Sequence, residues 1–317
     1  RRLIEVFTTL PITADELHQI GLDEARGTLA DEFVEIGTRA FGKVDLAGVL
    51  ERLRSDPKLR YSAADEIVGD ARRLVESAWE AAPEWFNLRP TTNCAVLPVP
   101  DELAKDSPPA YYFPPAQDGS RAGTYFINTY RPEDRVRYDA ESVAFHEANP
   151  GHHFQLTLAQ ELRDIPAFRQ NAITTAYVEG WGLYAERLAQ EMGLYTSDLG
   201  LLGMVSAEAW RAGRLVVDTG IHAYGWSRNQ AVEFFQQWTA LDQQTIDTEV
   251  DRYMGMPGQA LAYKVGQREI LRLRTEAQRQ LGSRFDIKGF HDAVLGSGPV
   301  TLPILSRLVQ EWAKRAA

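Results

Sequence analysis

Three of the six histidines of this chain fall within eight residues, in the segment HEANPGHH at residues 146–153. In many zinc hydrolases two histidines one helical turn apart bind one metal ion, and the glutamate beside the first activates a water molecule. Here the residue one turn after His146 is Pro150, so this standard spacing is not met. The gathering of imidazoles beside the carboxylate of Glu147 still predicts a catalytic metal site.

The proline suggests how the histidines could converge. On an unbroken helix His152 would lie about 120° from the face of His146, and His153 roughly 10 Å further along the axis. With Zn–N bonds of about 2 Å, neither could share an ion with His146. Pro150 cannot donate to the carbonyl of His146, and Gly151 can adopt unusual dihedral angles. We therefore predict that Pro-Gly bulges the helix and returns His152 to the metal.

Only one of the two imidazoles of His152 and His153 is expected to bind the metal. We prefer His152 as the ligand and keep His153 as the alternative. Whichever of the two does not bind the metal is expected to support a ligand or to contact the substrate.

The third ligand is expected to be a carboxylate, because zinc held by two histidines usually takes one and leaves a position for water. The best candidate is Glu179, in the segment YVEGWGLYAE at residues 177–186. Gly180 and Gly182 lower helix propensity there, and a close approach of backbones around a metal would offset that cost. Glu186 is predicted to be a surface or ion-paired residue, with a place behind the ligands as the alternative. The cofactor is then one zinc ion, although Mn, Co or Fe also suit these ligands.

Further charged residues could contact a substrate. Arg211, Arg214, Asp218 and His222 follow one stripe of a predicted helix. The stripe either lines a cleft, where Arg214 and His222 could hold a substrate carboxylate, or forms an ion-paired buried face.

Two other substrate contacts are predicted from later and earlier segments. Residues 124–129 could be a strand that pairs with an extended peptide, and Asn128 could bind the peptide backbone. Lys264, with Arg268, forms a basic pair that either binds substrate or belongs to a solvated face.

Composition narrows the class of protein. The net charge of −10 argues against nucleic-acid binding, which needs a basic face. Cys94 is the only cysteine, so neither an internal disulfide nor a cysteine-based zinc site can form. No apolar run reaches the roughly 18 residues of a membrane span, and no signal peptide is present. We expect a cytoplasmic protein, although the chain starts at Arg1, and a leader or lipoprotein signal upstream of it stays compatible with this sequence.

The periodicity predicts a mainly α (α+β) fold in one domain, 1–317. Residues 1–86 form its helical N-terminal part, and 87–131 are rich in proline with short β-prone runs at 94–97, 111–113 and 124–127, predicted as a small antiparallel sheet. Residues 132–317 form the helical zinc-site region. Its helices are predicted at 139–149, 152–164, 170–192, 197–220, 227–238, 243–253, 258–281, 286–294 and 301–315.

Four segments together resemble a known bacterial family, the domain of unknown function 885. They are HEANPGHH with the following Phe154-Gln155, residues 177–186, PGQALAYKVG at 257–266 and GTYFINT at 123–129. The resemblance runs from about residue 90 to the C-terminus. It implies a helical zincin-like metallopeptidase fold with the sheet beside the metal, similar to thimet-type oligopeptidases and helical carboxypeptidases. Family members are often longer, with a further helical region at the N-terminus that this chain is expected to lack.

The resemblance also implies a tyrosine over the metal that donates to the developing oxyanion. Tyr263 is the first candidate and Tyr253 the second, with a core tyrosine as the alternative for either. We expect zinc-dependent hydrolysis of short peptides or small amides, in which Glu147 moves a proton from water to the leaving amine. The alternatives are a hydrolase of non-peptide amides or esters, and a non-catalytic, metal-stabilised peptide-binding module.

Overall fold

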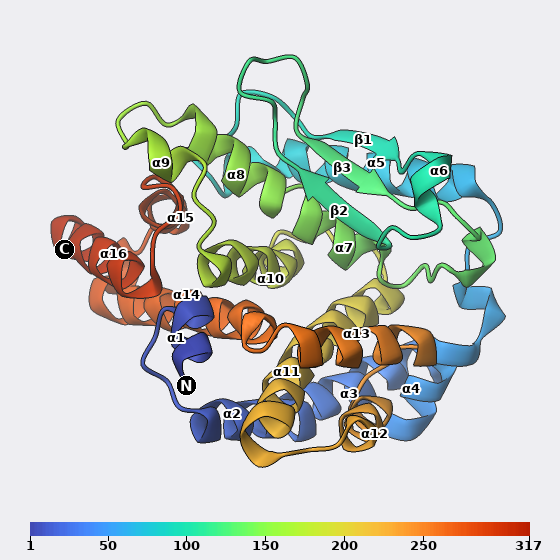
Figure 1. The fold of residues 1–317 in the computed structure, drawn as a ribbon. Helices are drawn as coiled ribbons and strands as arrows, with labels where there is room; N and C mark the ends of the chain where they lie inside the picture. Colours follow the sequence, from blue (N-terminus) through green and yellow to red (C-terminus); the bar gives the residue numbers. More distant parts are fainter.

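The computed structural model describes residues 1–317, and helices dominate it (Figure 1). The N-terminal part consists of helices joined by short turns. Thr13 accepts a hydrogen bond from Glu16 N, and the Glu16 side chain accepts one from Thr13 N, so this pair starts the second helix as a capping box. The elements are α1 (Arg2–Thr8), α2 (Ala14–Arg26), α3 (Thr28–Phe41), α4 (Leu46–Ser55), η1 (Pro57–Leu59), α5 (Ala64–Ala81) and η2 (Ala82–Glu84).

The predicted sheet exists, but it is mixed rather than antiparallel. Its strands are β1 (Ala95–Pro98), β2 (Ala110–Phe113) and β3 (Thr124–Ile127), in the order β1-β3-β2. Strands β2 and β3 form an antiparallel pair, whereas β1 and β3 run parallel. The reason is the connection, since the chain passes from β1 through α6 (Asp101–Ala104) to β2 and then turns back to place β3 between them. Helix α5 packs against β1 and β3, and β2 contacts the helices that carry the histidines.

The C-terminal two thirds are helical as predicted, with one break. The predicted helix 170–192 starts later, at residue 175, because residues 171–174 are not helical, and a separate short helix at 167–170 precedes them. The elements are η3 (Pro132–Asp134), α7 (Ala140–Glu147), α8 (His152–Glu161), α9 (Ala167–Gln170), α10 (Thr175–Glu191), α11 (Asp198–Tyr224), α12 (Arg228–Trp238), α13 (Gln243–Gly255), η4 (Gln259–Leu261), α14 (Ala262–Leu281), η5 (Gly282–Arg284), α15 (Ile287–Leu295) and α16 (Leu302–Ala316).

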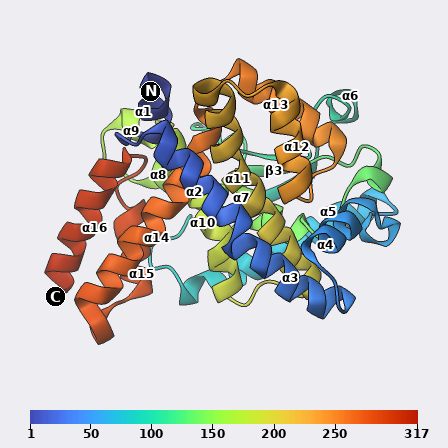
Figure 2. The same cartoon turned by 90° about the horizontal axis from the view of Figure 1, so that it is seen from below.

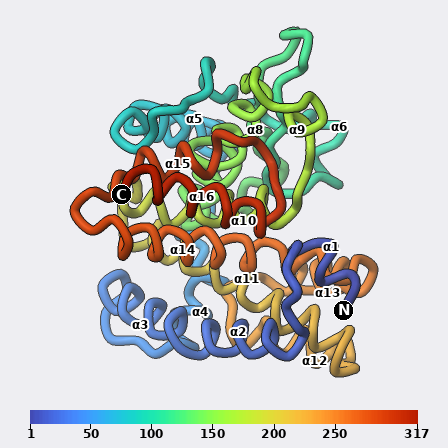
Figure 3. Tube along the Cα trace, turned by 90° about the vertical axis from the view of Figure 1, so that its left-hand side faces the viewer, coloured from blue at the N-terminus to red at the C-terminus, as the bar shows by residue number.

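Helix α10 lies in the interior of the molecule, with α7 and α8 on one side and α14 on the other (Figures 1 and 3). It packs closely on α14 because two glycines face each other, and a Cβ on Gly180 would lie 2.4 Å from Gly266 Cα. Around it lies the largest apolar cluster, of 25 buried residues, which includes Trp181 and Tyr177. Helix α11 crosses below, flanked by α2 and α3 (Figure 2). None of the helices combines the length and the apolar composition that a membrane span requires.

Candidate metal centre

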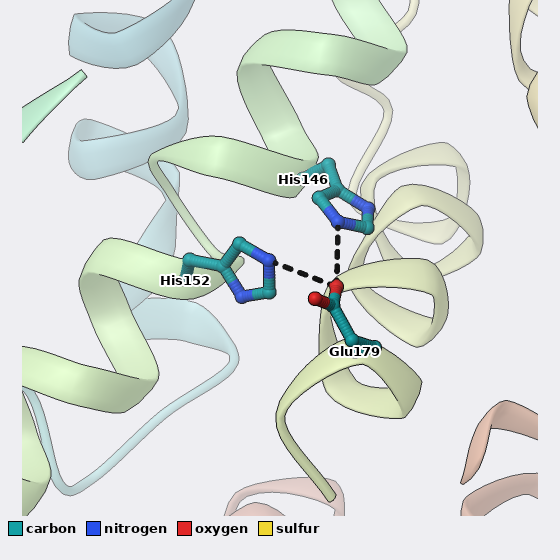
Figure 4. A group of neighbouring side chains, drawn as sticks. All are labelled: His146, His152 and Glu179. Atoms are coloured by element: carbon teal, nitrogen blue, oxygen red, sulfur yellow. Dashed lines mark ion pairs between the residues drawn. The ribbon is translucent and has the colours of Figure 1, made fainter. Parts of the chain in front are cut away.

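Three predicted ligands come together between α7, α8 and α10 (Figure 4). His146 lies in the last turn of α7, His152 is the first residue of α8, and Glu179 lies in the second turn of α10. Glu179 Oε2 is 3.6 Å from His146 Nε2 and 3.3 Å from His152 Nε2. One ligand atom from each residue lies within 4.8 Å of the others. Of the two candidates for the second imidazole, His152 is therefore the one that the fold brings to this cluster.

The chain breaks between the two histidines instead of bulging as predicted. Helix α7 ends at Glu147, and α8 begins in a new direction at His152. Gly151 is required at the break, because a Cβ there would lie 1.9 Å from the carbonyl oxygen of His146. Trp181 Nε1 donates to Pro150 O at 2.9 Å, so the loop is tied to the helix that carries Glu179.

A buried carboxylate holds the first histidine. His146 Nδ1 donates to Glu186 Oε1 at 2.7 Å, and Glu186 is 1% exposed. This corrects the preferred prediction of a surface or ion-paired residue and agrees with the alternative, a place behind the candidate ligands. The bond leaves His146 Nε2 facing Glu179 and fixes the ring orientation, as carboxylates behind metal-binding histidines commonly do.

The electrostatics of the cluster favour a cation. Burial opposes the charged imidazole, but the hydrogen bonds that it donates to Glu179 and Glu186 outweigh burial and raise the pKa of His146 to about 9. Burial likewise opposes ionisation of Glu179, yet the two imidazoles lower the pKa of that carboxyl below its ordinary value. Neither carboxylate has a lysine or arginine partner. The buried Glu186 and the half-buried Glu179, without a fixed counter-ion, favour a cation between the ligand atoms.

The spacing and chemistry of the donors fit zinc. Tetrahedral zinc with bonds of about 2.0–2.1 Å separates its ligand atoms by about 3.4 Å. The observed separations of 3.3 Å and 3.6 Å from Glu179 Oε2 match that edge. Two imidazoles and one carboxylate are also a donor set found in catalytic zinc sites, which keep a fourth position for water. The residues present therefore fit the metal that the sequence predicted.

Glu147 is the last residue of α7, half-buried and adjacent to the ligand His146. Its carboxylate forms no ion pair and no hydrogen bond, unlike Glu179 and Glu186. Burial raises the pKa of the Tyr125 hydroxyl, and the nearby charge of Glu147 adds to that effect. Glu147 thus offers a carboxylate without a partner one residue after His146.

The two candidate tyrosines differ in their surroundings. Burial raises the pKa of Tyr263, and the charge of Glu179 adds to the rise, so its ring lies near the cluster. Tyr253 is fully buried, and its hydroxyl accepts from Arg214 Nε at 2.7 Å and from Trp210 Nε1 at 3.1 Å while it donates to Glu249. The prediction of Tyr253 as a catalytic donor is wrong, because these partners use its hydroxyl group. Tyr263 remains the candidate.

His153 is a core residue. It is fully buried, and its Nε2 donates to Thr92 O at 2.9 Å while Nδ1 accepts from the Tyr112 hydroxyl at 3.1 Å. Burial lowers the pKa of His153 to about 4, so the ring is neutral. The expectation that the second imidazole contacts substrate is wrong for this residue, because both ring nitrogens are bonded inside the protein.

The charged stripe of α11 divides into two parts. Arg214 is buried and pairs with Glu249 at 3.0 Å, and Asp218 accepts from Gly258 N at 2.8 Å. His222 is exposed, and its Nε2 donates to Tyr253 O at 2.9 Å. These contacts join α11 to α13 and the turn after it, as expected for an ion-paired face. They favour the ion-paired face over substrate binding, because Arg214 Nε and Nη2 and His222 Nε2 are bonded within the fold.

Two more predicted substrate contacts are structural. Lys264 is 3% exposed, with its Nζ 2.6 Å from both Glu208 and Glu24, so it is neither solvated nor free for a substrate. Asn128 is buried, and its amide donates to Ala104 O at 2.6 Å and to Ser107 O at 3.0 Å. The strand of residues 124–127 is central in the sheet and hydrogen-bonded on both sides, so it cannot pair with a peptide as predicted.

The close approach predicted at Gly182 exists, but the neighbours are the two imidazole rings and not another backbone. A Cβ there would lie 2.7 Å from His146 Cε1 and 3.0 Å from His152 Cε1, so only glycine lets both rings reach Glu179. A signal existed, because Glu179, Gly182 and Glu186 are spaced i, i+3 and i+7 and share one helix face.

Comparison with known proteins gives a family and two similar structures. The family described as bacterial protein of unknown function (DUF885) matches residues 1–309, including the helical part that the motifs did not cover. The crystal structure of a candidate lipoprotein from Colwellia psychrerythraea is 34% identical, with a TM-score of 0.95 over 99% of this chain and 55% of that chain. A candidate lipoprotein of unknown function from Shewanella oneidensis, 20% identical, shares the fold, with a TM-score of 0.80 over 98% of this chain and 58% of that chain. The chain thus spans less than two thirds of either protein. No curated protein matches significantly.

Proposed function

Since this chain belongs to the bacterial DUF885 family, we propose that it is a zinc-dependent hydrolase that cleaves short peptides. One observation carries the proposal. Two separations within the cluster of His146, His152 and Glu179 match the edge of a zinc tetrahedron, and Glu147, the neighbour of His146 in the chain, has a carboxylate without a partner. A purely structural metal site has no need of such a base.

In this proposal His146, His152 and Glu179 would hold the ion, with Glu186 keeping His146 in its orientation. Zinc bound there would act as a Lewis acid on an amide carbonyl and lower the pKa of water. The Glu147 carboxylate would accept a proton from the attacking water and deliver it to the leaving amine. The Tyr263 hydroxyl would donate to the oxygen on which negative charge develops.

The same residues could hydrolyse a non-peptide amide or an ester, and a peptide-binding module stabilised by metal is the non-enzymatic alternative. The proposed substrate is therefore a peptide or small amide. The cytoplasmic location expected from the sequence stays a prediction, beside relatives that are described as candidate lipoproteins.

The test combines metal content with turnover. We expect elemental analysis of protein purified without added metal to find about one zinc per chain, and none after His146→Ala or Glu179→Ala. Glu147→Gln should keep the zinc but cleave a mixed peptide library about 10²–10⁴-fold more slowly, because the amide cannot accept the proton. Glu51→Gln, on an exposed face of α4, is the matched control and should behave as wild type.

Other results of these assays would lead to a different functional assignment. Zinc in the wild type together with equal rates for Glu147→Gln and wild type would refute the assignment of the base. Turnover of esters or acylated amines with no cleavage of peptides would establish the alternative, a hydrolase of non-peptide amides or esters. Absence of zinc, even after it is supplied, would remove the metallohydrolase proposal.

A further inference from the structure

A cavity of about 210 Å³ lies between the small sheet and helix α11. Strand β3 and the first turns of α7 form one wall through Tyr125 and Val143, and α11 forms the opposite wall through Trp210 and Arg211. In Figure 1 this is the region between β3 and α7 above and α11 and α13 below.

Four arginines from four separate segments line this cavity, and none of them has an ion-pair partner. Most other arginines of α11 and α14 do form ion pairs. All four are half-buried. Arg54 donates to the carbonyls of Gln236 and Thr239, and Arg211 donates to Ala207 O in its own helix. The four are Arg54, Arg60, Arg135 and Arg211.

Three of the hydrogen-bond donors around the cavity are unused. Arg54 Nε, Arg211 Nε and the Tyr125 hydroxyl are buried and have no hydrogen-bond partner. Tyr125 is itself fully buried, and burial raises the pKa of its hydroxyl, so this group stays protonated and able to donate. Buried donors are rarely left without acceptors, and a group of them in one cavity points to a ligand that accepts.

The acidic residues of the cavity do not satisfy these donors. Asp134 pairs with the exposed Arg131 at 2.9 Å, and Asp242 caps α13 through Thr245 N at 3.0 Å. Asp139 forms no ion pair, and burial raises its pKa although the charges of Arg135, Arg60 and Arg211 oppose the rise, so four arginines face three aspartates in the lining. The cavity therefore keeps a surplus of positive charge.

The cavity adjoins the candidate metal centre. Val143 precedes Glu147 by one turn of α7, and the charge of Glu147 contributes to the raised pKa of Tyr125. Across the cavity, the guanidinium carbon of Arg211 is 6.0 Å from the ring centroid of Tyr263. A ligand in the cavity would thus extend toward the residues proposed to act on a peptide bond.

We propose that this cavity binds a carboxylate of the peptide substrate, and that the chain therefore prefers peptides that carry a free C-terminal carboxylate. The inference rests on the proposed function for the identity of the ligand as a peptide. Guanidinium groups are suited to the task because they bind carboxylates through two parallel hydrogen bonds. A glutamate side chain near the cleaved bond offers the same chemistry, and the test separates the two sources.

The experiment compares three tetrapeptide probes with the zinc-loaded protein. They are N-acetyl-tetraalanine with a free carboxylate, the same peptide as its carboxamide, and a carboxamide with one internal glutamate. Binding is measured by calorimetry on the Glu147→Gln variant, and cleavage by mass spectrometry on the wild type. We expect the free-carboxylate peptide to bind about 10–100-fold more tightly than the neutral carboxamide.

The arginines are tested by Arg211→Met, which keeps the apolar stem, and by Arg135→Met in case the first variant does not fold. Either change should remove most of the preference, whereas Arg39→Met on the exposed face of α3 should leave it intact. A preference for the internal glutamate that the same variants remove would support a side-chain carboxylate as the ligand.

Equal binding of all three probes, or a preference that survives both cavity variants, would overturn the proposal. Carboxylate-dependent binding without cleavage of any peptide would retain this site and reject the proposed peptidase activity. Cleavage of carboxamide and free acid at equal rates would retain the peptidase and reject the carboxylate site.

Discussion

The substitution Gly182→Ala tests whether the helix face of Glu179 is shaped for the two imidazoles. The new Cβ would lie 2.7 Å from His146 Cε1 and 3.0 Å from His152 Cε1, and ordinary contact begins at 3.4 Å. The rings would have to move by about 0.7 Å and 0.4 Å, whereas metal–ligand distances tolerate about 0.2 Å. We expect zinc affinity to fall about 10–100-fold, which corresponds to about 1.4–2.8 kcal/mol.

The assay is a competition titration of zinc against a chromophoric chelator, with urea unfolding of the metal-free protein measured in parallel. Alanine favours the helix by about 1 kcal/mol, so the metal-free variant should stay folded and close to wild type in stability. Gly69→Ala is the matched control, because Gly69 is exposed in α5 and a Cβ added there would meet no atom within 4 Å. It should leave zinc affinity unchanged. Wild-type zinc affinity in Gly182→Ala would refute the reasoning.

Three further outcomes are expected. Gly180→Ala should lower the free energy of unfolding in urea by about 1–3 kcal/mol, because its Cβ would lie 2.4 Å from Gly266 Cα; unchanged stability would contradict the close helix packing. Glu186→Gln should weaken zinc binding about 10-fold in the chelator assay, since a neutral amide no longer increases the basicity of His146, and equal affinity would remove that role. Burial lowers the pKa of His291 to about 3, below its unfolded value of about 6.5. The neutral ring therefore contributes fully to the free energy of unfolding above pH 6.5. This contribution is lost as the pH falls toward 3, by about 1.4 kcal/mol per pH unit. Urea unfolding between pH 7 and pH 5 should show a steeper loss for wild type than for His291→Gln, and identical slopes would contradict this.

Local patterns were enough to find most of the helices and the ligand set. Apolar periodicity located the helical segments within a few residues, because helices depend on neighbours in the sequence. Residue type and spacing singled out His146 and Glu179, and the Pro-Gly interruption predicted that His152 returns to them, although through a bulge and not through the break that the structure has.

Local sequence patterns could not predict how the strands pair or which partners the polar side chains bind. The β-prone runs predicted strands, but only the path through α6 and β2 decides that β1 lies parallel to β3. Asn128 and Lys264 had the chemistry of substrate contacts, and distant carbonyl and carboxylate groups in the fold turned them into structural residues.

By itself, the sequence determined the donor types of the candidate metal centre, the family and the helical character of the chain, since these depend on composition and on spacing along one helix. Tertiary structure alone decided that His152 and not His153 faces Glu179, because Trp181 and its bond to Pro150 fix the loop before α8. It also decided that the arginines of one cavity meet there, because they come from four separate segments that no local pattern relates.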